Sequence, residues 1–224
     1  MELQGIKQQV QRFMEERCAQ QRQWLGRQLG RAQVFDYRLE HTRTCVGLAW
    51  AMAPELGLSS ELAAIAAWLH DLAKCADLSL TDQENRARFK DHGNAGAREA
   101  RAYLNSLGLP GPEAEMIAEA IRLHVGFFRD TPLSQPLAAL LWDADKLSKI
   151  SLAGTMHFLL GQLAEGREIT LTDYYANEMD MAWREGICNS MNTSLAKAWA
   201  KAELELVAMV RQETLRTLLG RPPI

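Results

Sequence analysis

Residues 61–74 read ELAAIAAWLHDLAK, a run of helix-forming apolar residues that ends on polar ones. A serine just before the run can cap a helix there, and the apolar side chains then lie along one side of it. Successive residues on a helix are about 100° apart, so His70 and Asp71 can both reach a point between their directions. Lys74 lies one turn further along on the same face. The stretch therefore predicts a buried helix with the polar side chains of His70, Asp71 and Lys74 at its end.

The rest of the chain has the composition of a helical protein. Of its 224 residues, 47% are hydrophobic, and 31 alanines and 32 leucines stand against 6 valines and 8 isoleucines. Alanine and leucine favour helices, whereas β-branched residues favour strands. The composition predicts an all-α fold and argues against a β-sandwich, a barrel or a large parallel sheet.

Apolar periodicity, prolines and glycines predict helix after helix, with almost no strand-like alternation. We expect a bundle of eight to ten helices in a single all-α domain over residues 1–224. It consists of a core at about 36–150, an N-terminal helix at 2–30 and a C-terminal helical extension at 151–219. Other helices are expected at 36–53, 61–74, 92–107, 112–125, 134–150, 151–164, 171–186 and 193–219, with residues 75–90 irregular.

Charge and apolar patterning exclude several classes of partner. Lysine and arginine total 25 against 28 acidic residues, a net charge of −3, so nucleic acid is not an expected partner. The longest apolar runs are far too short for a membrane span. The first residues show no signal-peptide pattern, and the four cysteines form no CxxC pair. We therefore expect reduced thiols and a cytoplasmic location.

Four of the five histidines and two aspartates fall on successive predicted helices. His124 follows two isoleucines at helical spacing and so projects from an apolar face. Four inward histidines without a metal would each need a separate partner. Imidazole with carboxylate suits Fe, Mn, Zn or Co better than Ca. We therefore expect a metal centre with the candidate ligands His41, His70, Asp71, His92, His124 and Asp145.

The pattern His41, then His70-Asp71, then Asp145 resembles the HD-domain superfamily of metal-dependent phosphohydrolases. The segments Leu-His-Asp-Leu-Ala-Lys and Ala-Asp-Lys-Leu are close to that family's local patterns, and the resemblance covers about residues 36–150. It implies an HD-domain helical bundle with additional N- and C-terminal helices. It also implies that these four residues hold a first metal.

His92 followed by Gly93, and His124 followed by Gly126, resemble a subgroup with two extra histidines. That subgroup includes bacterial dinucleoside-tetraphosphate hydrolases and cyclic-dinucleotide phosphodiesterases. It implies a second metal on His92 and His124 with Asp71 bridging, and one or two divalent transition metals in all: iron first, then Mn, Zn, Co or Ni. A valine where the tetraphosphate hydrolases tend to have threonine, and the absence of a Gly-Tyr-Pro tripeptide, leave the substrate less defined than the chemistry.

The implied reaction is hydrolysis of a phosphate ester or anhydride by a metal-activated water, with a nucleotide as the expected small-molecule substrate. Asp71 and Lys74 are the expected catalytic residues, with Lys74 neutralising charge on the phosphoryl oxygens. Two alternatives stay open: a di-iron HD-type oxygenase with the same six ligands, and a nucleotide-binding regulator with a structural metal site. A homodimer is compatible with each of them.

Other polar residues near the pattern are expected to have lesser roles. Asp143 and Asp145 are about 200° apart on a helix, so both cannot face one centre. The match to Ala-Asp-Lys-Leu selects Asp145, and Asp143 is expected to orient a ligand or water, or to lie on the helix surface. Lys146 is expected to be solvated, and His157 to be structural or peripheral. Arg43 and Arg122 should point away from their neighbouring histidines.

Overall fold

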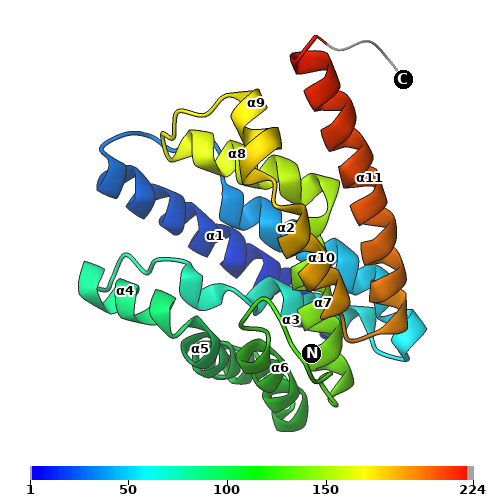
Figure 1. Cartoon of the computed structure of the whole chain (residues 1–224). Helices are drawn as coiled ribbons and strands as arrows, with labels where there is room; N and C mark the ends of the chain where they lie inside the picture. Colours follow the sequence, from blue (N-terminus) through cyan, green and yellow to red (C-terminus); the bar gives the residue numbers. More distant parts are fainter. Residues whose placement is uncertain (1, 221–224) are drawn as a thin grey trace.

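The computed structural model describes residues 2–220, and all regular secondary structure in that range is helical (Figure 1). The all-α prediction is confirmed. Within this range no helix has the length and apolarity needed to cross a lipid bilayer. The helices are α1 (Leu3–Leu29), α2 (Tyr37–Met52), α3 (Ser60–Leu69), α4 (Asp82–Lys90), α5 (His92–Ser106), α6 (Gly111–Leu123), α7 (Pro136–Ile150), α8 (Leu152–Ala164), α9 (Leu171–Asp173), α10 (Met181–Asn189) and α11 (Ser194–Leu218), with short 3₁₀ turns η1 (Pro54–Leu56) and η2 (Leu72–Lys74) and a π-helical segment η3 (Tyr174–Glu178).

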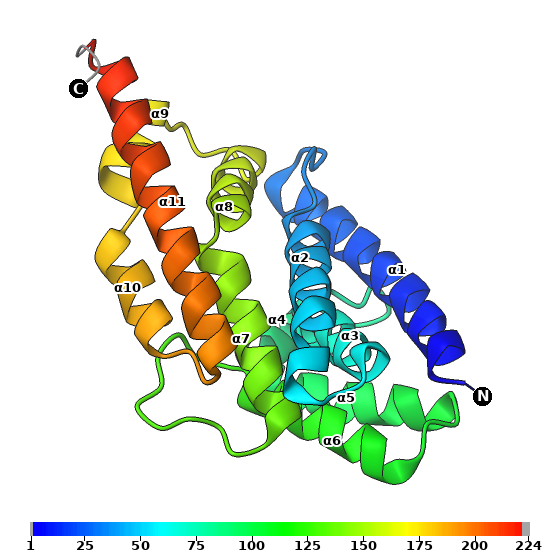
Figure 2. The same cartoon turned by 90° about the vertical axis from the view of Figure 1, so that its right-hand side faces the viewer.

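Helix α3 lies at the centre because it is apolar on every side. All of its residues from Leu62 to Leu69 are buried. A helix that is hydrophobic all round must be covered all round, and α1, α2, α6 and α7 pack against it. Figure 2 shows α1 and α11 at opposite edges of the molecule, with α2, α3 and α7 between them.

Helix α7 is the second central element. It packs against α2, α6, α8, α10 and α11, and even its polar residues Asp143, Asp145, Lys146 and Ser148 are buried. Buried charges persist only when they are paired and hydrogen-bonded. The polar groups of α7 therefore mark places where the core is built around specific partners.

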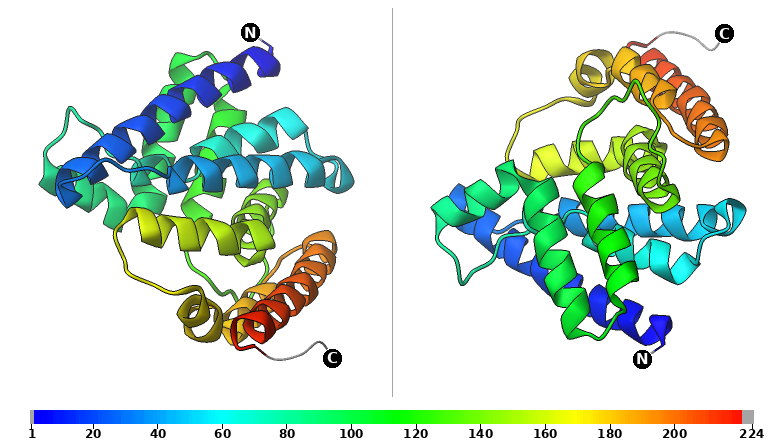
Figure 3. Two further views of the ribbon diagram at one scale, coloured as in Figure 1. Left: turned by 90° about the horizontal axis from the view of Figure 1, so that it is seen from above. Right: turned by 90° about the horizontal axis from the view of Figure 1, so that it is seen from below.

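The C-terminal extension shares the main core with the rest of the chain. Ile187, Met191, Ala196 and Ala200 belong to the same buried cluster as residues of α1, α3 and α7. A smaller cluster joins Leu159 of α8 to η3 and α11. In Figure 3, α8 lies between α2 and α11. The single domain over 1–224 stays a prediction, and its ends, residue 1 and residues 221–224, lie outside the described residues.

Two predicted segments differ from the structure. Residues 75–90 are not all irregular, because α4 forms over Asp82–Lys90. Its start is fixed by a capping box, in which Thr81 accepts from the Glu84 backbone and Glu84 accepts from the Thr81 backbone. The segment 171–186 is not one helix: α9, η3 and α10 divide it, and Asp180 caps α10.

The expected helix over 61–74 is also wrong in its last turn. Regular α-structure ends at Leu69, and Asp71 leaves the helical region with φ −105° and ψ 21° before η2 begins. Because of this break, the polar end of the segment forms a turn and does not continue the helix. All four cysteines are free, and three of them are buried.

Candidate metal centre

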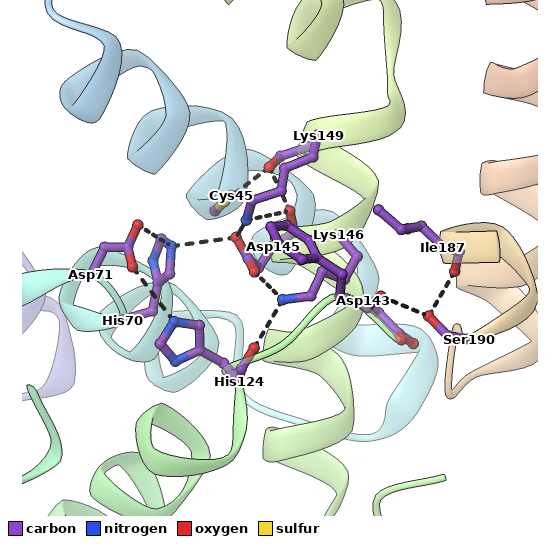
Figure 4. Close-up of polar contacts among 12 residues, drawn as sticks. Cys45, His70, Asp71, His124, Asp143, Asp145, Lys146, Lys149, Ile187 and Ser190 are labelled. Carbon is purple, nitrogen blue, oxygen red and sulfur yellow. Dashed lines mark hydrogen bonds and ion pairs between the residues drawn. The ribbon is translucent and has the colours of Figure 1, made fainter. Parts of the chain in front are cut away.

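The six candidate ligands come from different elements and meet in one region between α2, α3, α5, α6 and α7. Figure 4 shows His70, Asp71, His124 and Asp145 pointing toward one another. Each except His92 is buried, and His92 is half-buried. Their ligand atoms form two groups, one of His41, His70, Asp145 and Cys45, the other of Asp71, His92 and His124, and within each group the atoms lie within 4.8 Å of one another.

The first group is compact. His41 Nε2 lies 3.1 Å from Asp145 Oδ1 and 3.2 Å from His70 Nε2. Cys45 was not predicted as part of it, and its Sγ lies 3.7 Å from His41 Nε2. Burial raises the pKa of the Cys45 thiol to about 12, which favours the protonated form that donates to Ser148 Oγ at 3.4 Å. As a protonated thiol, Cys45 lines the first group and is not counted among its ligands.

The second group shares a carboxylate with the first. Asp71 Oδ2 lies 3.5 Å from His70 Nε2 and 3.7 Å from His41 Nε2, whereas Asp71 Oδ1 lies 3.5 Å from His124 Nε2. The His92 and His124 rings are 5.3 Å apart. The two oxygens of Asp71 thus face different groups of histidines.

Helix ends orient two of the histidines. His70 and His124 are the C-caps of α3 and α6. The last carbonyls of a helix have no backbone partner within it, and each ring uses one three residues back: His70 Nδ1 lies 2.7 Å from Ala67 O, and His124 Nδ1 lies 2.5 Å from Ile121 O. An Nδ1–H that donates there leaves Nε2 as a free lone pair facing the centre.

The protonation states suit metal binding. Burial lowers the pKa of His70 to about 3, and those of His41 and His92 to about 4, so all three rings are neutral at pH 7. Burial would raise the pKa of Asp71, but the charges around it, that of Arg38 first and then those of His70 and Lys74, together outweigh burial and hold that pKa well below its usual range. Neutral imidazoles beside ionised carboxylates are the donors that divalent transition ions prefer.

One carboxylate oxygen of Asp71 lacks a hydrogen bond, which also favours the binding of a cation. Asp71 Oδ1 is buried and accepts no hydrogen bond. Lys74 Nζ lies 3.3 Å from it, at ion-pair distance. A buried carboxylate oxygen without a hydrogen bond is costly unless another positive group completes it. The cluster can therefore hold a divalent metal, and its chemistry does not select which one.

Four cations surround the two carboxylates. Arg38 pairs with Asp71, as Lys74 does, and Lys146 and Lys149 both pair with Asp145 (Figure 4 shows the two lysines). Arg38 and Lys149 are not among the residues expected from the sequence, although both carry a local signal. Arg38 lies three residues before His41, and Lys149 lies four after Asp145, so each shares a helix face with a candidate ligand.

Lys146 is not solvated, and that expectation is wrong. Its side chain is 2% exposed, and its Nζ donates to His124 O at 2.8 Å while it pairs with Asp145. The Nζ also lies 4.2 Å from the centroid of the Trp142 ring. Burial lowers the pKa of Lys146 to about 8. Lys146 therefore ties the end of α6 to α7.

Asp143 neither orients a ligand nor lies on the surface. Its buried carboxylate accepts from the backbone N–H and the side-chain amide of Asn192, at 2.7 and 3.0 Å. It also accepts from the backbone N–H and hydroxyl of Thr193, at 2.9 and 2.8 Å. Asp143 thus fastens α7 to the start of α11, on the side of α7 away from the metal centre.

The remaining polar candidates lie outside both groups. His157 is half-buried beside Phe35. Arg43 pairs with Glu15 and Glu40, and Arg122 pairs with Glu119. These arginines are held by surface carboxylates and do not join the centre.

The family model described as "HD domain" matches residues 38–178. YpgQ from Bacillus subtilis is 21% identical, with a TM-score of 0.60 over 92% of this chain and 98% of that one. A structure of YpgQ in complex with ADP is 21% identical, with a TM-score of 0.56 over 87% and 94% of the two chains. An HD-superfamily hydrolase from Bacillus thuringiensis is 15% identical, with a TM-score of 0.63 over 98% and 100%.

No curated protein matches the sequence significantly. At these identities the solved structures support the fold alone, and that fold is the one the HD-superfamily hydrolase has. The family model covers well over half of the chain and includes His41, the His70–Asp71 pair, His92, His124 and Asp145. The chain belongs to the HD-domain family.

Proposed function

We propose that the protein is a metal-dependent phosphohydrolase with a two-ion centre. The observation that carries the proposal is the placement of Asp71, whose two oxygens face different histidine groups. One carboxylate between two sets of imidazoles suits a pair of divalent ions. His41, His70, Asp71 and Asp145 would hold the first ion, and Asp71, His92 and His124 would hold the second.

Divalent ions bound there would lower the pKa of a bound water and supply a hydroxide near neutral pH. The chain's own residues bind and orient the phosphate. The side chains of Lys74, Arg38 and Lys149 are 29, 18 and 12% exposed, so an anion can reach them although each pairs with a carboxylate. Cations placed at the phosphoryl oxygens neutralise the charge that develops during phosphoryl transfer.

We further propose a nucleotide as the substrate. The three partly exposed cations favour a compound with more than one phosphate charge. The structural neighbour YpgQ has been solved with ADP, which supports a nucleotide without naming it. Nucleoside phosphates and dinucleoside polyphosphates are the candidates, and iron is the first candidate metal, ahead of Mn, Zn, Co and Ni.

An anaerobic activity screen with metal analysis tests this function. Purified protein is analysed for bound metal and incubated without oxygen with ADP, diadenosine tetraphosphate and a phosphomonoester. We expect bound divalent metal, and phosphate or nucleotide release from at least one substrate. Turnover only with oxygen and reduced iron would replace the hydrolase by an oxygenase. Tight ADP binding without turnover under any of the five metals would instead indicate a regulator.

A further inference from the structure

Four aromatic side chains form a continuous row beside the metal centre. Tyr37 of α2 lies 5.8 Å from Phe158 of α8, measured between ring centroids. Phe158 lies 6.4 Å from Trp183 of α10, and Trp183 lies 5.6 Å from Phe127 in the segment between α6 and α7. These spacings fall in the range of aromatic pairs in contact. Four separate elements thus contribute one ring each to a single row.

One end of the row adjoins a candidate metal ligand, and the other end lies in the segment that follows one. The Tyr37 ring lies 5.9 Å from the His41 ring, and the two planes differ by 3°. Phe127 follows His124 by three residues. His41 belongs to the first ligand group and His124 to the second. The row therefore starts beside the first ligand group and continues through rings of α8 and α10 to the segment that follows His124.

The rings in the row remain accessible to solvent. The Phe127 side chain belongs to a residue that is 49% exposed, and Tyr37, Phe158 and Trp183 are half-buried. Trp142 on the neighbouring α7 is fully buried in comparison. A core aromatic cluster would not leave one ring after another partly uncovered. Partly exposed aromatic side chains beside a polar centre match the side-chain composition of a ligand site.

A cation connects the row to the centre. The Arg38 guanidinium lies 5.6 Å from the Tyr37 ring and also pairs with Asp71. A phosphate held by Arg38 would therefore have its attached group beside Tyr37 and Phe158. Tyr37 is the first ring from His41 and Phe158 is the second, and a ribose can span the distance between His41 and these rings.

We propose that the aromatic row binds the base of a nucleotide substrate by stacking, with Phe158 and Trp183 as its specificity-determining residues. This inference rests on the proposed hydrolysis of a nucleotide at the metal centre. Every base offers a flat π-face, so stacking selects an aromatic base without selecting which one. The row makes the enzyme prefer nucleotides over phosphates that lack a base, and it does so with residues that touch no metal.

Two variants test the stacking, Phe158→Leu and Trp183→Leu, which keep apolar bulk and remove the aromatic face. Wild type and variants are loaded with Mn²⁺ and assayed with ADP and with tripolyphosphate, which has phosphates but no base. We expect kcat/KM for ADP to fall about tenfold, chiefly through KM, since stacking on one side chain contributes on that order. The value for tripolyphosphate stays unchanged.

The matched control is Tyr103→Leu. Tyr103 stacks on Phe13 at 4.1 Å between α5 and α1, outside the row. This control should lower neither activity. Equal losses on both substrates in the row variants would assign the row a structural role, and unchanged values for ADP would overturn the inference. Melting temperatures of all variants identify any loss due to misfolding.

A binding measurement separates this inference from the proposed function. Calorimetric titration of the Mn²⁺-loaded protein with ADP measures affinity whether or not hydrolysis occurs. We expect the ADP affinity of both row variants to fall about tenfold relative to wild type. Absence of turnover with that loss of affinity would reject the hydrolase and keep the base site. Turnover with unaltered ADP affinity in the variants would keep the hydrolase and reject the base site.

Discussion

At the scale of single residues, Asp71 is the residue whose two oxygens face both candidate ligand groups. Asp71→Asn keeps the shape of the side chain and removes the charge that both ligand groups share. We expect bound metal to fall and hydrolysis to drop by more than about 100-fold, since even indirect ligand partners are worth 10–100-fold. Metal analysis and phosphate release measure the two effects together.

The fifth histidine supplies a control for this change. His157 lies outside both ligand groups, so His157→Gln should bind as much metal as wild type. Full metal occupancy with undiminished turnover in Asp71→Asn would contradict the proposed centre.

Lys74 is a second residue with a testable role. Lys74→Met removes the ammonium 3.3 Å from Asp71 Oδ1 and leaves every candidate ligand in place. We expect kcat/KM to fall roughly 10- to 100-fold, because the phosphoryl oxygens lose a positive charge that stabilises the transition state. Each tenfold step corresponds to about 1.4 kcal/mol of lost transition-state stabilisation. Bound metal should stay unchanged. Steady-state kinetics measure the loss, and the exposed Lys90→Met is the matched control.

Asp143 is expected to affect stability directly. Asp143→Ala leaves the partly buried N–H groups of Asn192 and Thr193 without their acceptor. We expect unfolding free energy to fall by roughly 2–3 kcal/mol, the cost of orphaned donors to a charged group. Urea denaturation measures it, and Asp130→Ala on the exposed surface should change little. An equal, small effect of both variants would mean that the Asp143 contacts contribute nothing net.

The same residues show how far sequence reaches at this scale. The four candidate histidines could be named in advance because histidine is scarce here and helical spacing places His124 on an apolar face, and the two aspartates because their segments match the local patterns of the family. The partners of Asp143 could not, since Asn192 is 49 residues away and only the folded chain brings it close. Lys146 was misjudged because its burial depends on the end of α6, which lies 22 residues earlier.

At the scale of elements, the junction of α7 and α8 is the tightest contact near the centre. A Cβ on Gly154 would lie 2.2 Å from Ser148 O and 2.6 Å from Lys149 O. We expect Gly154→Ala to push α8 away from the end of α7 and to destabilise the fold by more than about 2 kcal/mol, because backbone atoms cannot rotate aside. Thermal unfolding checks this.

An open glycine on α2 gives the opposite expectation. Gly47 lies within α2, and nothing lies within 4 Å of a Cβ built there. Gly47→Ala should stabilise the protein by about 0.5–1 kcal/mol, because alanine has the higher helix propensity. Destabilisation by both alanines would show that the geometry at Gly154 is not the cause.

Elements with an apolar stripe were predictable, and elements held by local polar contacts were not. Helices α5, α7 and α11 follow from periodicity within a few residues of their bounds. Helix α4 has almost no apolar residues, so apolar periodicity does not reveal it, and its capping box lies in a polar segment that resembles a loop. No glycine or proline marks the end of α3 in the sequence, so the turn at Asp71 could not be predicted.

At the scale of the whole molecule, the prediction of one domain has a direct test. Residues of α10 and α11 share a buried cluster with those of α1 and α3. A shared core unfolds as one unit, so we expect a single calorimetric transition with equal calorimetric and van't Hoff enthalpies. Two resolved transitions would mean that the C-terminal extension is a separate unit.

Asp143 and Asp145, on nearly opposite sides of α7, together fix the rotation of this helix about its own axis. Asp143 is bonded to the start of α11, and Asp145 faces His41 on nearly the opposite side. Turning α7 about its axis to shorten one contact lengthens the other, so the two aspartates lock its angular setting between them. A change in the loop that carries Asn192 would therefore reach the candidate metal centre as a rotation of α7, although no hydrogen bond among the described residues joins that loop to a candidate ligand.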